Sequence, residues 1–121
     1  MVGWLAGWPV GWLAGQALQC YQEAYELDPE NVLILNNQAA VYFARKEYDT
    51  CVQVCQRAVE RATEIMAPFA HKAKIFSRLG NAEHKRGNLA AAIEAYDKSL
   101  MEHHSDDVYA RRKKVLVRLA P

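Results

Sequence analysis

Two basic residues, Lys74 and Arg78, lie four positions apart in a segment with helical periodicity. That spacing places both side chains on one face of a helix, where their like charges repel weakly and can hold an anion. Lysine supplies a point charge, and arginine supplies a forked set of donors. Asn81 lies three residues beyond Arg78 and extends the same surface. From spacing alone, an anion site and a plain solvated face both remain open.

The remaining polar residues do not predict catalysis. None of the four histidines has a serine, cysteine or carboxylate partner at the spacing of a catalytic motif; they are His71, His84, His103 and His104. The adjacent pair His103 and His104 points in two directions on a helix, so we expect both to be solvated, as we do Glu23 and Glu26. No glycine-rich phosphate loop is present. The sequence therefore predicts a protein that is not an enzyme and has no cofactor or metal.

Three cysteines, Cys20, Cys51 and Cys55, do not form a disulfide framework, because their number is odd and no secretory signal precedes them. Cys51 and Cys55 share one helix face and could form half of a metal site, but no second pair completes it. We expect all three to be small core residues in a reducing compartment.

Length and composition predict one globular domain. The chain has 121 residues, of which 51% are hydrophobic and 24% charged, and its net charge is +1. This length is sufficient to bury a core. A net charge near zero provides no overall field for nucleic acid or for a membrane, so neither is expected as a partner.

Helical periodicity and scarce proline after residue 16 predict an all-α fold of antiparallel hairpins. Ser105 is the expected N-cap of the last helix, with Asp106 and Asp107 at its positive end. This basic helix is expected to cap the stack through Val108, Val115, Leu116 and Leu119; the alternative is docking on a membrane or an acidic partner. The predicted helices span residues 15–27, 32–45, 48–64, 70–86, 89–103 and 106–119.

An internal repeat organises these helices. Residues 36–60 align with 77–101, so that small residues coincide: Ala39, Cys51 and Ala58 fall on Gly80, Ala92 and Ser99. A partial earlier copy ends at the turn Asp28-Pro29. This small and large pattern resembles the tetratricopeptide repeat, whose inner helices line a concave groove. Asn37 falls on the position of Arg78, so an amide and two cations at the groove floor would suit a peptide that ends in a carboxylate.

Specific strings sharpen the resemblance. NNQAAVYFARKEY, AKIFSRLGN, YELDPEN and YDKSLMEHHSDDV make residues 17–118 similar to the middle tetratricopeptide domain of the stress-inducible heat-shock-protein organising co-chaperones. The resemblance implies a cytoplasmic adaptor that binds the acidic Glu-Glu-Val-Asp tail of the ninety-kilodalton heat-shock chaperone. It also implies a two-carboxylate clamp for the terminal Asp, in which Asn37, Lys74 and Arg78 occupy three of five positions.

The first 15 residues depart from that pattern. The other two clamp positions of the family fall on Val2 and Ala6, which cannot replace a lysine and an asparagine. Pro9 would interrupt a helix there. The segment lacks the basic start of a signal peptide and is shorter than a membrane span. We therefore expect an apolar segment at 1–15 joined to a domain at 16–121, which divides into a partial repeat 16–31, repeats 32–65 and 70–104, and the cap 106–119.

Three interpretations of this segment remain open. It is a non-family N-terminus whose tryptophans cover the apolar face of the helix at 15–27, a distorted first helix broken near Pro9, or an interfacial anchor formed by Trp4, Trp8 and Trp12. The sequence thus predicts a tail-binding module with a weakened clamp. The alternative is a non-catalytic helical scaffold that self-associates or binds apolar partners through the tryptophans.

Overall fold

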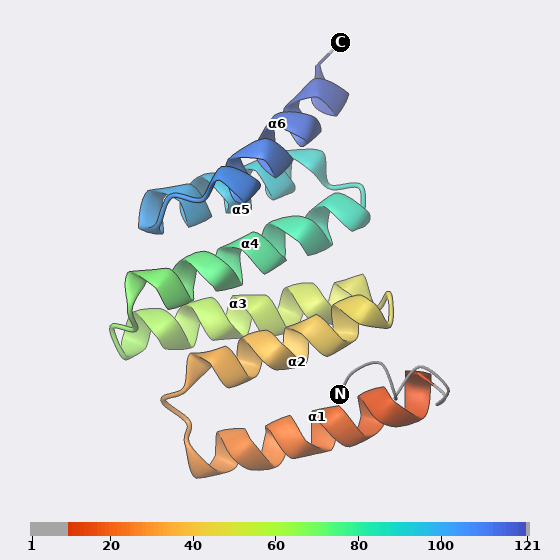
Figure 1. Ribbon diagram of the computed structural model, residues 1–121, viewed down its shortest axis with the longest axis vertical. Coiled ribbons are helices and arrows are strands. Elements are labelled where there is room, and N and C mark those ends of the chain that lie inside the picture. Colours follow the sequence, from red (N-terminus) through yellow and green to blue (C-terminus); the bar gives the residue numbers. More distant parts are fainter. Residues whose placement is uncertain (1–9, 121) are drawn as a thin grey trace.

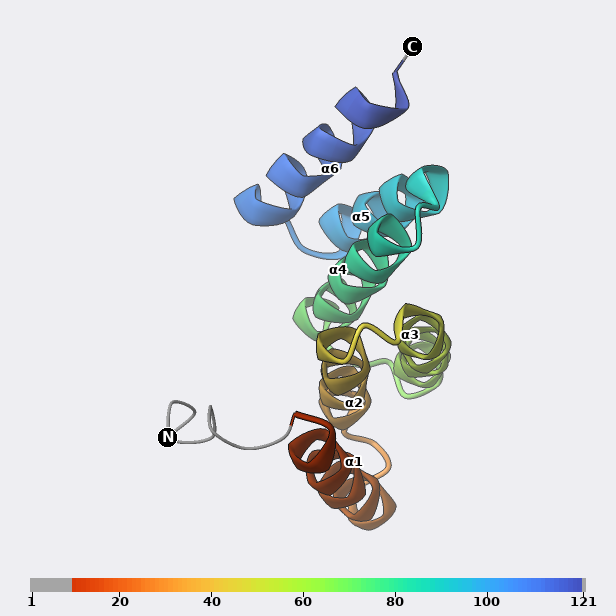
Figure 2. The same cartoon turned by 90° about the vertical axis from the view of Figure 1, so that its right-hand side faces the viewer.

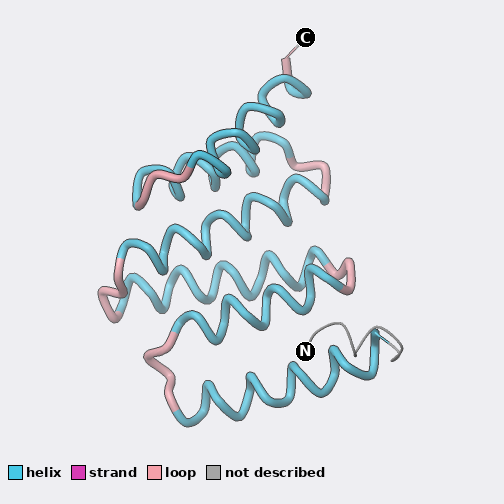
Figure 3. The backbone as a smooth tube through the Cα atoms, in the orientation of Figure 1, coloured by secondary structure: helices cyan, strands magenta, loops and turns pink. Residues whose placement is uncertain are grey.

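The computed structural model describes residues 10–120, which form six α-helices joined by short loops and contain no strand (Figures 1 and 3). Within this range no helix combines the length and apolar character needed to cross a membrane. The predicted all-α hairpin fold is confirmed. The helices are α1 (Val10–Leu27), α2 (Val32–Ala44), α3 (Tyr48–Glu64), α4 (Phe69–Lys85), α5 (Leu89–Glu102) and α6 (Asp106–Leu119).

Five of these helices begin and end within one residue of the predicted bounds, but α1 begins at Val10 and not at residue 15. Val10 directly follows Pro9 in the sequence, and proline is well tolerated immediately before or within a first helical turn. Gly15 lies within α1 without ending it. The helix therefore runs without a break through the expected boundary at residues 15 and 16. The interpretations that concern residues 1–9, including Trp4 and Trp8, lie outside the described residues, as does the Trp12 side chain.

The helices stack in chain order, each packed against the next, and α2 also contacts α4 directly (Figure 1). Seen from the side, α3 is displaced away from the line that joins α2 and α4 (Figure 2). Alternate helices of the stack thus form an inner row. This arrangement brings α2, α4 and α6 to the same side of the molecule, where side chains of all three can line one cavity.

The register of small residues explains how closely the helices pack. Ala39, Cys51 and Ala58 are fully buried between α2, α3 and α4, and Ala92 and Ser99 are buried at the matching positions of α5. Gly80 is the tightest of these positions, because a Cβ atom built there would lie 2.5 Å from Cε1 of Tyr96. The alignment of small residues predicted from sequence is therefore confirmed as the packing register.

One cysteine assignment was wrong. Cys51 and Cys55 are fully buried as expected, whereas Cys20 is exposed. The buried or half-buried side chains of α1 follow a helical stripe to which Cys20 does not belong; they are Ala14, Ala17, Leu18, Tyr21, Ala24 and Tyr25. Glu23 and Glu26 are exposed, as predicted.

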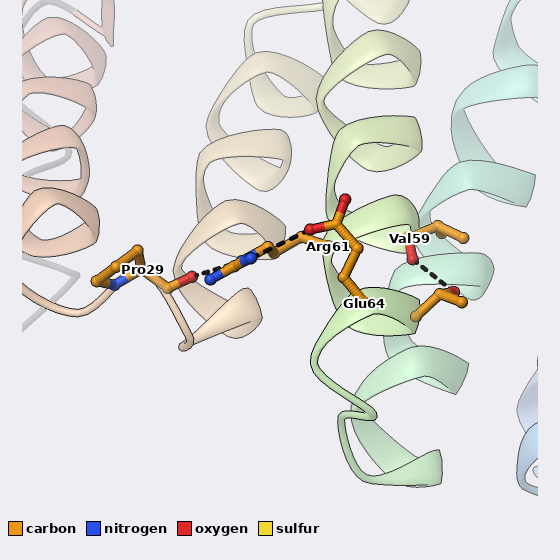
Figure 4. A network of polar contacts seen from close by, with 5 residues as sticks. Pro29, Val59, Arg61 and Glu64 are labelled. Carbon is orange, nitrogen blue, oxygen red and sulfur yellow. Dashed lines mark hydrogen bonds and ion pairs between the residues drawn. The ribbon is translucent and has the colours of Figure 1, made fainter.

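Side chains also fix the helix ends and loops. Ser105 Oγ accepts a hydrogen bond from the backbone N–H of Val108, which confirms the predicted N-cap of α6. Figure 4 shows how Arg61 of α3 donates through Nε to the carbonyl of Pro29 at 3.1 Å and pairs with Glu64. This bond ties the loop between α1 and α2 to the third helix.

The packed side of α6 is narrower than the sequence predicted. Val108 and Val115 are buried, but Leu116 is 36% exposed and Leu119 is 49% exposed. The expectation that both leucines pack was wrong because α6 contacts α5 along a narrow stripe, in which Val108 and Val115 lie seven residues apart.

Candidate functional site

The inner row of helices encloses a cavity of about 510 Å³, open to solvent. Four of its lining residues project from α4, one from α2 and one from α5, and the others come from α6 and the loop before it. Three cations and one carboxylate are among them, so the cavity favours an anion. The polar and charged lining residues are Asn36, Lys74, Ser77, Arg78, Asn81, Ser99, His103, His104, Ser105, Asp107 and Arg111.

Three of the four residues predicted from sequence meet in this cavity. Lys74, Arg78 and Asn81 lie on one face of α4, with Ser77 between them. Lys74 is exposed, and Arg78 and Asn81 are half-buried. Within residues 10–120 neither Lys74 nor Arg78 forms an ion pair, so both cations are available to a ligand.

Arg78 is held in place by a residue that the sequence analysis did not select. Its Nε donates to Oδ1 of Asn36, 3.3 Å away on α2, and Asn36 is only 7% exposed. Because a guanidinium group has five N–H donors, this bond leaves the two terminal nitrogens free while fixing the plane of the group. Asn36 therefore orients the cation across the contact between α2 and α4.

The neighbouring asparagine takes a different position. Asn37 matches Arg78 in the repeat register, but it is exposed and does not line the cavity. Asn36 matches Ser77 in the same register, and both of these residues do line it. The repeat alignment contained this signal, since it paired Asn36 with a residue of the same helix face as Lys74 and Arg78.

Asn81 is oriented by the tyrosine beneath it. The Tyr96 hydroxyl donates to Oδ1 of Asn81 at 2.6 Å, and the tyrosine ring is 1% exposed. Because the carbonyl oxygen is occupied, the amide nitrogen of Asn81 remains as a donor. Burial raises the pKa of Tyr96, which keeps its hydroxyl protonated and able to donate.

Arg111 is a further cation that the sequence analysis had assigned only to the capping helix. It lines the cavity from α6, and its Nη2 lies 3.0 Å from Oδ2 of Asp107, one turn earlier. Local sequence could not reveal this position, because the angle at which α6 crosses α4 decides which of its basic residues face inward. The pair is exposed, so it contributes little stability and can exchange for a ligand carboxylate.

The two adjacent histidines border the same cavity. His103 and His104 are both exposed, as predicted, and His104 Nε2 lies 3.0 Å from Oδ1 of Asp106. In the described part of the chain, no group of three His, Cys, Asp or Glu residues is placed to hold a metal ion. The arrangement suits non-covalent binding of an anion by fixed cations and amides.

Comparisons with known proteins agree with this geometry. A family model described as "Tetratricopeptide repeat" matches residues 30–100. "Stress-induced-phosphoprotein 1" of Caenorhabditis elegans is 40% identical over 95 residues, which are 78% of this chain and 30% of that protein. "Protein STIP1 homolog" of Dictyostelium discoideum is 37% identical over 100 residues, which are 83% of this chain and 18% of that protein. The chain spans less than a third of the length of either relative.

Solved structures of related domains superimpose on most of the chain. The structure titled "TPR2AB-domain:pHSP90-complex of yeast Sti1" is similar with a TM-score of 0.85 and 36% identity, covering 88% of this chain and 41% of that one. The N-terminal domain of stress-induced protein-1 from C. elegans is similar with a TM-score of 0.71 and 40% identity, covering 78% of this chain and 75% of that one.

Proposed function

Because the chain belongs to the tetratricopeptide repeat family and is homologous to the repeat domains of Hsp70–Hsp90 organising proteins, we propose that it is a cytoplasmic, non-catalytic co-chaperone adaptor. In this proposal it binds the acidic C-terminal Glu-Glu-Val-Asp tail of the ninety-kilodalton heat-shock chaperone. The observation that carries the proposal is the pair of unpaired cations, Lys74 and Arg78, in a cavity whose amides are already oriented. A similar yeast domain carries an HSP90 complex in its title.

A terminal aspartate fits the chemistry of this cavity. It presents two carboxylates close together, one on the side chain and one at the chain end. The free terminal nitrogens of Arg78 can donate two parallel bonds to one of them, and Lys74 can pair with the other. Asn81 contributes its amide nitrogen, since its oxygen already accepts from Tyr96. Asn37, exposed on α2 in register with Arg78, supplies a further donor for the chain end.

The proposed clamp is incomplete. The family's remaining lysine and asparagine fall on Val2 and Ala6, neither of which has a polar side chain. A hydrogen bond to a charged group contributes about 1.5–3 kcal/mol, so the absence of two removes about 3–6 kcal/mol if they act independently. The effects of neighbouring groups are not fully additive. Even about 3 kcal/mol corresponds to more than a hundredfold in affinity, so we expect weak binding.

A fluorescence-anisotropy titration of the full chain with a labelled peptide ending in Glu-Glu-Val-Asp tests the proposal. Binding is expected at low salt and should weaken as ionic strength rises, because exposed charges are screened. Lys74→Glu and Arg78→Glu should each abolish it. Arg57→Glu, on an exposed position of α3, makes the same charge change away from the cavity and should leave binding intact. Absence of binding at low salt by a chain that circular dichroism shows to be folded would refute the proposal.

Two adjacent alanine variants separate contact from support. Asn37→Ala should weaken binding directly, since its exposed amide is proposed to touch the peptide. Asn36→Ala should weaken binding through Arg78, whose side chain loses its hydrogen bond across the helices. A peptide with a C-terminal amide should bind more weakly to both variants and to the unmodified chain. Equal affinity for amide and acid peptides would contradict a clamp that recognises the chain end.

A further inference from the structure

A second, smaller cavity of about 340 Å³ lies beside the first and shares two residues with it, Asn81 and Arg111. It is formed by the last turns of α4 together with α2, α5 and α6. Phe43 and Tyr96 provide apolar walls. Its titratable lining residues other than Tyr96 are His84, Lys85, Arg111 and Lys114, and none of its lining residues is acidic.

We propose that this second cavity binds a side-chain carboxylate of the same acidic tail, about five residues before its C-terminus. The inference rests on the proposed function for the direction of the peptide. It assigns Lys85 and Lys114 as specificity-determining residues that favour tails with an acidic residue at that distance. Arg111, shared by both cavities, would contact the chain between the two anion sites.

The spacing supports a single extended peptide across both cavities. From Lys74 to Lys85 the axis of α4 rises about 16 Å, at 1.5 Å per residue. An extended peptide covers about 3.3 Å per residue, so about five residues span that distance. A terminal aspartate at Lys74 and Arg78 therefore places an upstream side chain at the second cavity.

The electrostatics of the second cavity also require an anion. Arg118 Nη1 lies 3.1 Å from Nε2 of His84, and an arginine can only donate, so His84 accepts and is neutral. Burial, followed by the charges of Arg118 and Lys85, lowers the pKa of His84. Lys85 and Lys114 form no ion pair within residues 10–120, so their charges are uncompensated there. The first cavity, by contrast, contains Asp107 beside its cations.

The His84 ring provides a readout independent of the clamp. Two eight-residue peptides, both ending in Val-Asp with a free carboxylate, would carry glutamate or glutamine at the fifth residue before the end. A third peptide would carry glutamate there and a C-terminal amide. Each would be titrated into the chain while the His84 Cε1–H resonance is followed by NMR across pH. The glutamate peptides should raise the pKa of His84, because a nearby carboxylate stabilises the imidazolium form, and the glutamine peptide should not.

Matched variants locate the effect. Lys114→Gln should remove the preference for the glutamate peptide, which we expect to be about two- to fivefold in affinity for an exposed charge pair. Lys113→Gln, its exposed neighbour on α6 outside the cavity, should preserve the preference. A His84 pKa that does not change, or changes equally with glutamate and glutamine, would overturn the inference. Failure of the clamp alone is distinct, because a Glu-Glu-Val-Asp pentapeptide would then fail to bind while the amidated glutamate peptide still shifted His84.

Discussion

Replacing Gly80 by alanine should destabilise the protein, against the usual preference of helices for alanine. The new Cβ would lie 2.5 Å from Cε1 and 2.6 Å from Cδ1 of Tyr96, distances at which carbon atoms cannot remain. The ring cannot give way easily, because Tyr96 is 1% exposed and its hydroxyl is bonded to Asn81. Overpacking of this kind costs about 1–3 kcal/mol, and a weakened hydrogen bond adds about 1 kcal/mol.

Helix propensity opposes these costs but does not cancel them. Alanine is favoured over glycine in a helix interior by about 1 kcal/mol, so the net loss for Gly80→Ala should be about 1–3 kcal/mol. Gly15→Ala is the matched control, because a Cβ at Gly15 in α1 meets no atom within 4 Å. That variant should gain about 0.5–1 kcal/mol from propensity alone.

Urea unfolding followed by circular dichroism measures both variants. The double variant Gly80→Ala/Tyr96→Ala closes a mutant cycle, and its coupling energy should be of the size of the clash. The reasoning is refuted if Gly80→Ala matches or exceeds the stability of the unmodified chain, or if the cycle shows no coupling between the two positions.

Three further changes test other parts of the structure. Lys46, which has a φ of +63° at the repeat position of Gly87, should gain about 0.5–1 kcal/mol on replacement by glycine, whereas Gly87→Lys should lose a similar amount in the same urea assay. Ser99→Ala should lose about 0.5–1.5 kcal/mol in thermal unfolding, since the buried hydroxyl donates to the carbonyl of Ala73 at 2.8 Å. His84 has a lowered pKa in the folded state, so the unfolded chain binds more protons and stability should fall as pH drops through the ordinary histidine pKa. His84→Gln should flatten that part of a stability profile measured between pH 7 and pH 5, and an unchanged slope would contradict the assignment.

Local patterns were sufficient for most of the fold. Period and turn residues identified the helices, and the coincidence of Ala39 with Gly80 identified how hairpins pack, because both positions need a side chain small enough for a crossing helix. Cys20 was misjudged by residue type, since its own helix buries a stripe that does not include it. The start of α1 was misjudged because glycine weakens a helix by only about 1 kcal/mol per residue and does not end it.

The candidate site was harder to predict because it depends on angles between helices. Lys74, Arg78 and Asn81 share one face of a single helix, so their spacing was enough to group them. Asn36 and Asn37 are neighbours in sequence but point about 100° apart around the α2 axis, and only the packing of α2 against α4 decides which one meets Arg78. Arg111 joins the cavity through the crossing of α6, which no pattern within α6 records.

The bond between Arg61 and Pro29 has a consequence for how the molecule comes apart. The main contact of α1 is with α2, whereas α4 contacts α2, α3 and α5, and Arg61 holds the loop that follows α1. In a stack with nearest-neighbour contacts, the terminal helix opens at the lowest free energy. We expect the amides of α1 to exchange with deuterium first, and Arg61→Gln to hasten that exchange without affecting α4. The residues proposed to bind the tail would then remain folded in molecules whose first helix had already opened.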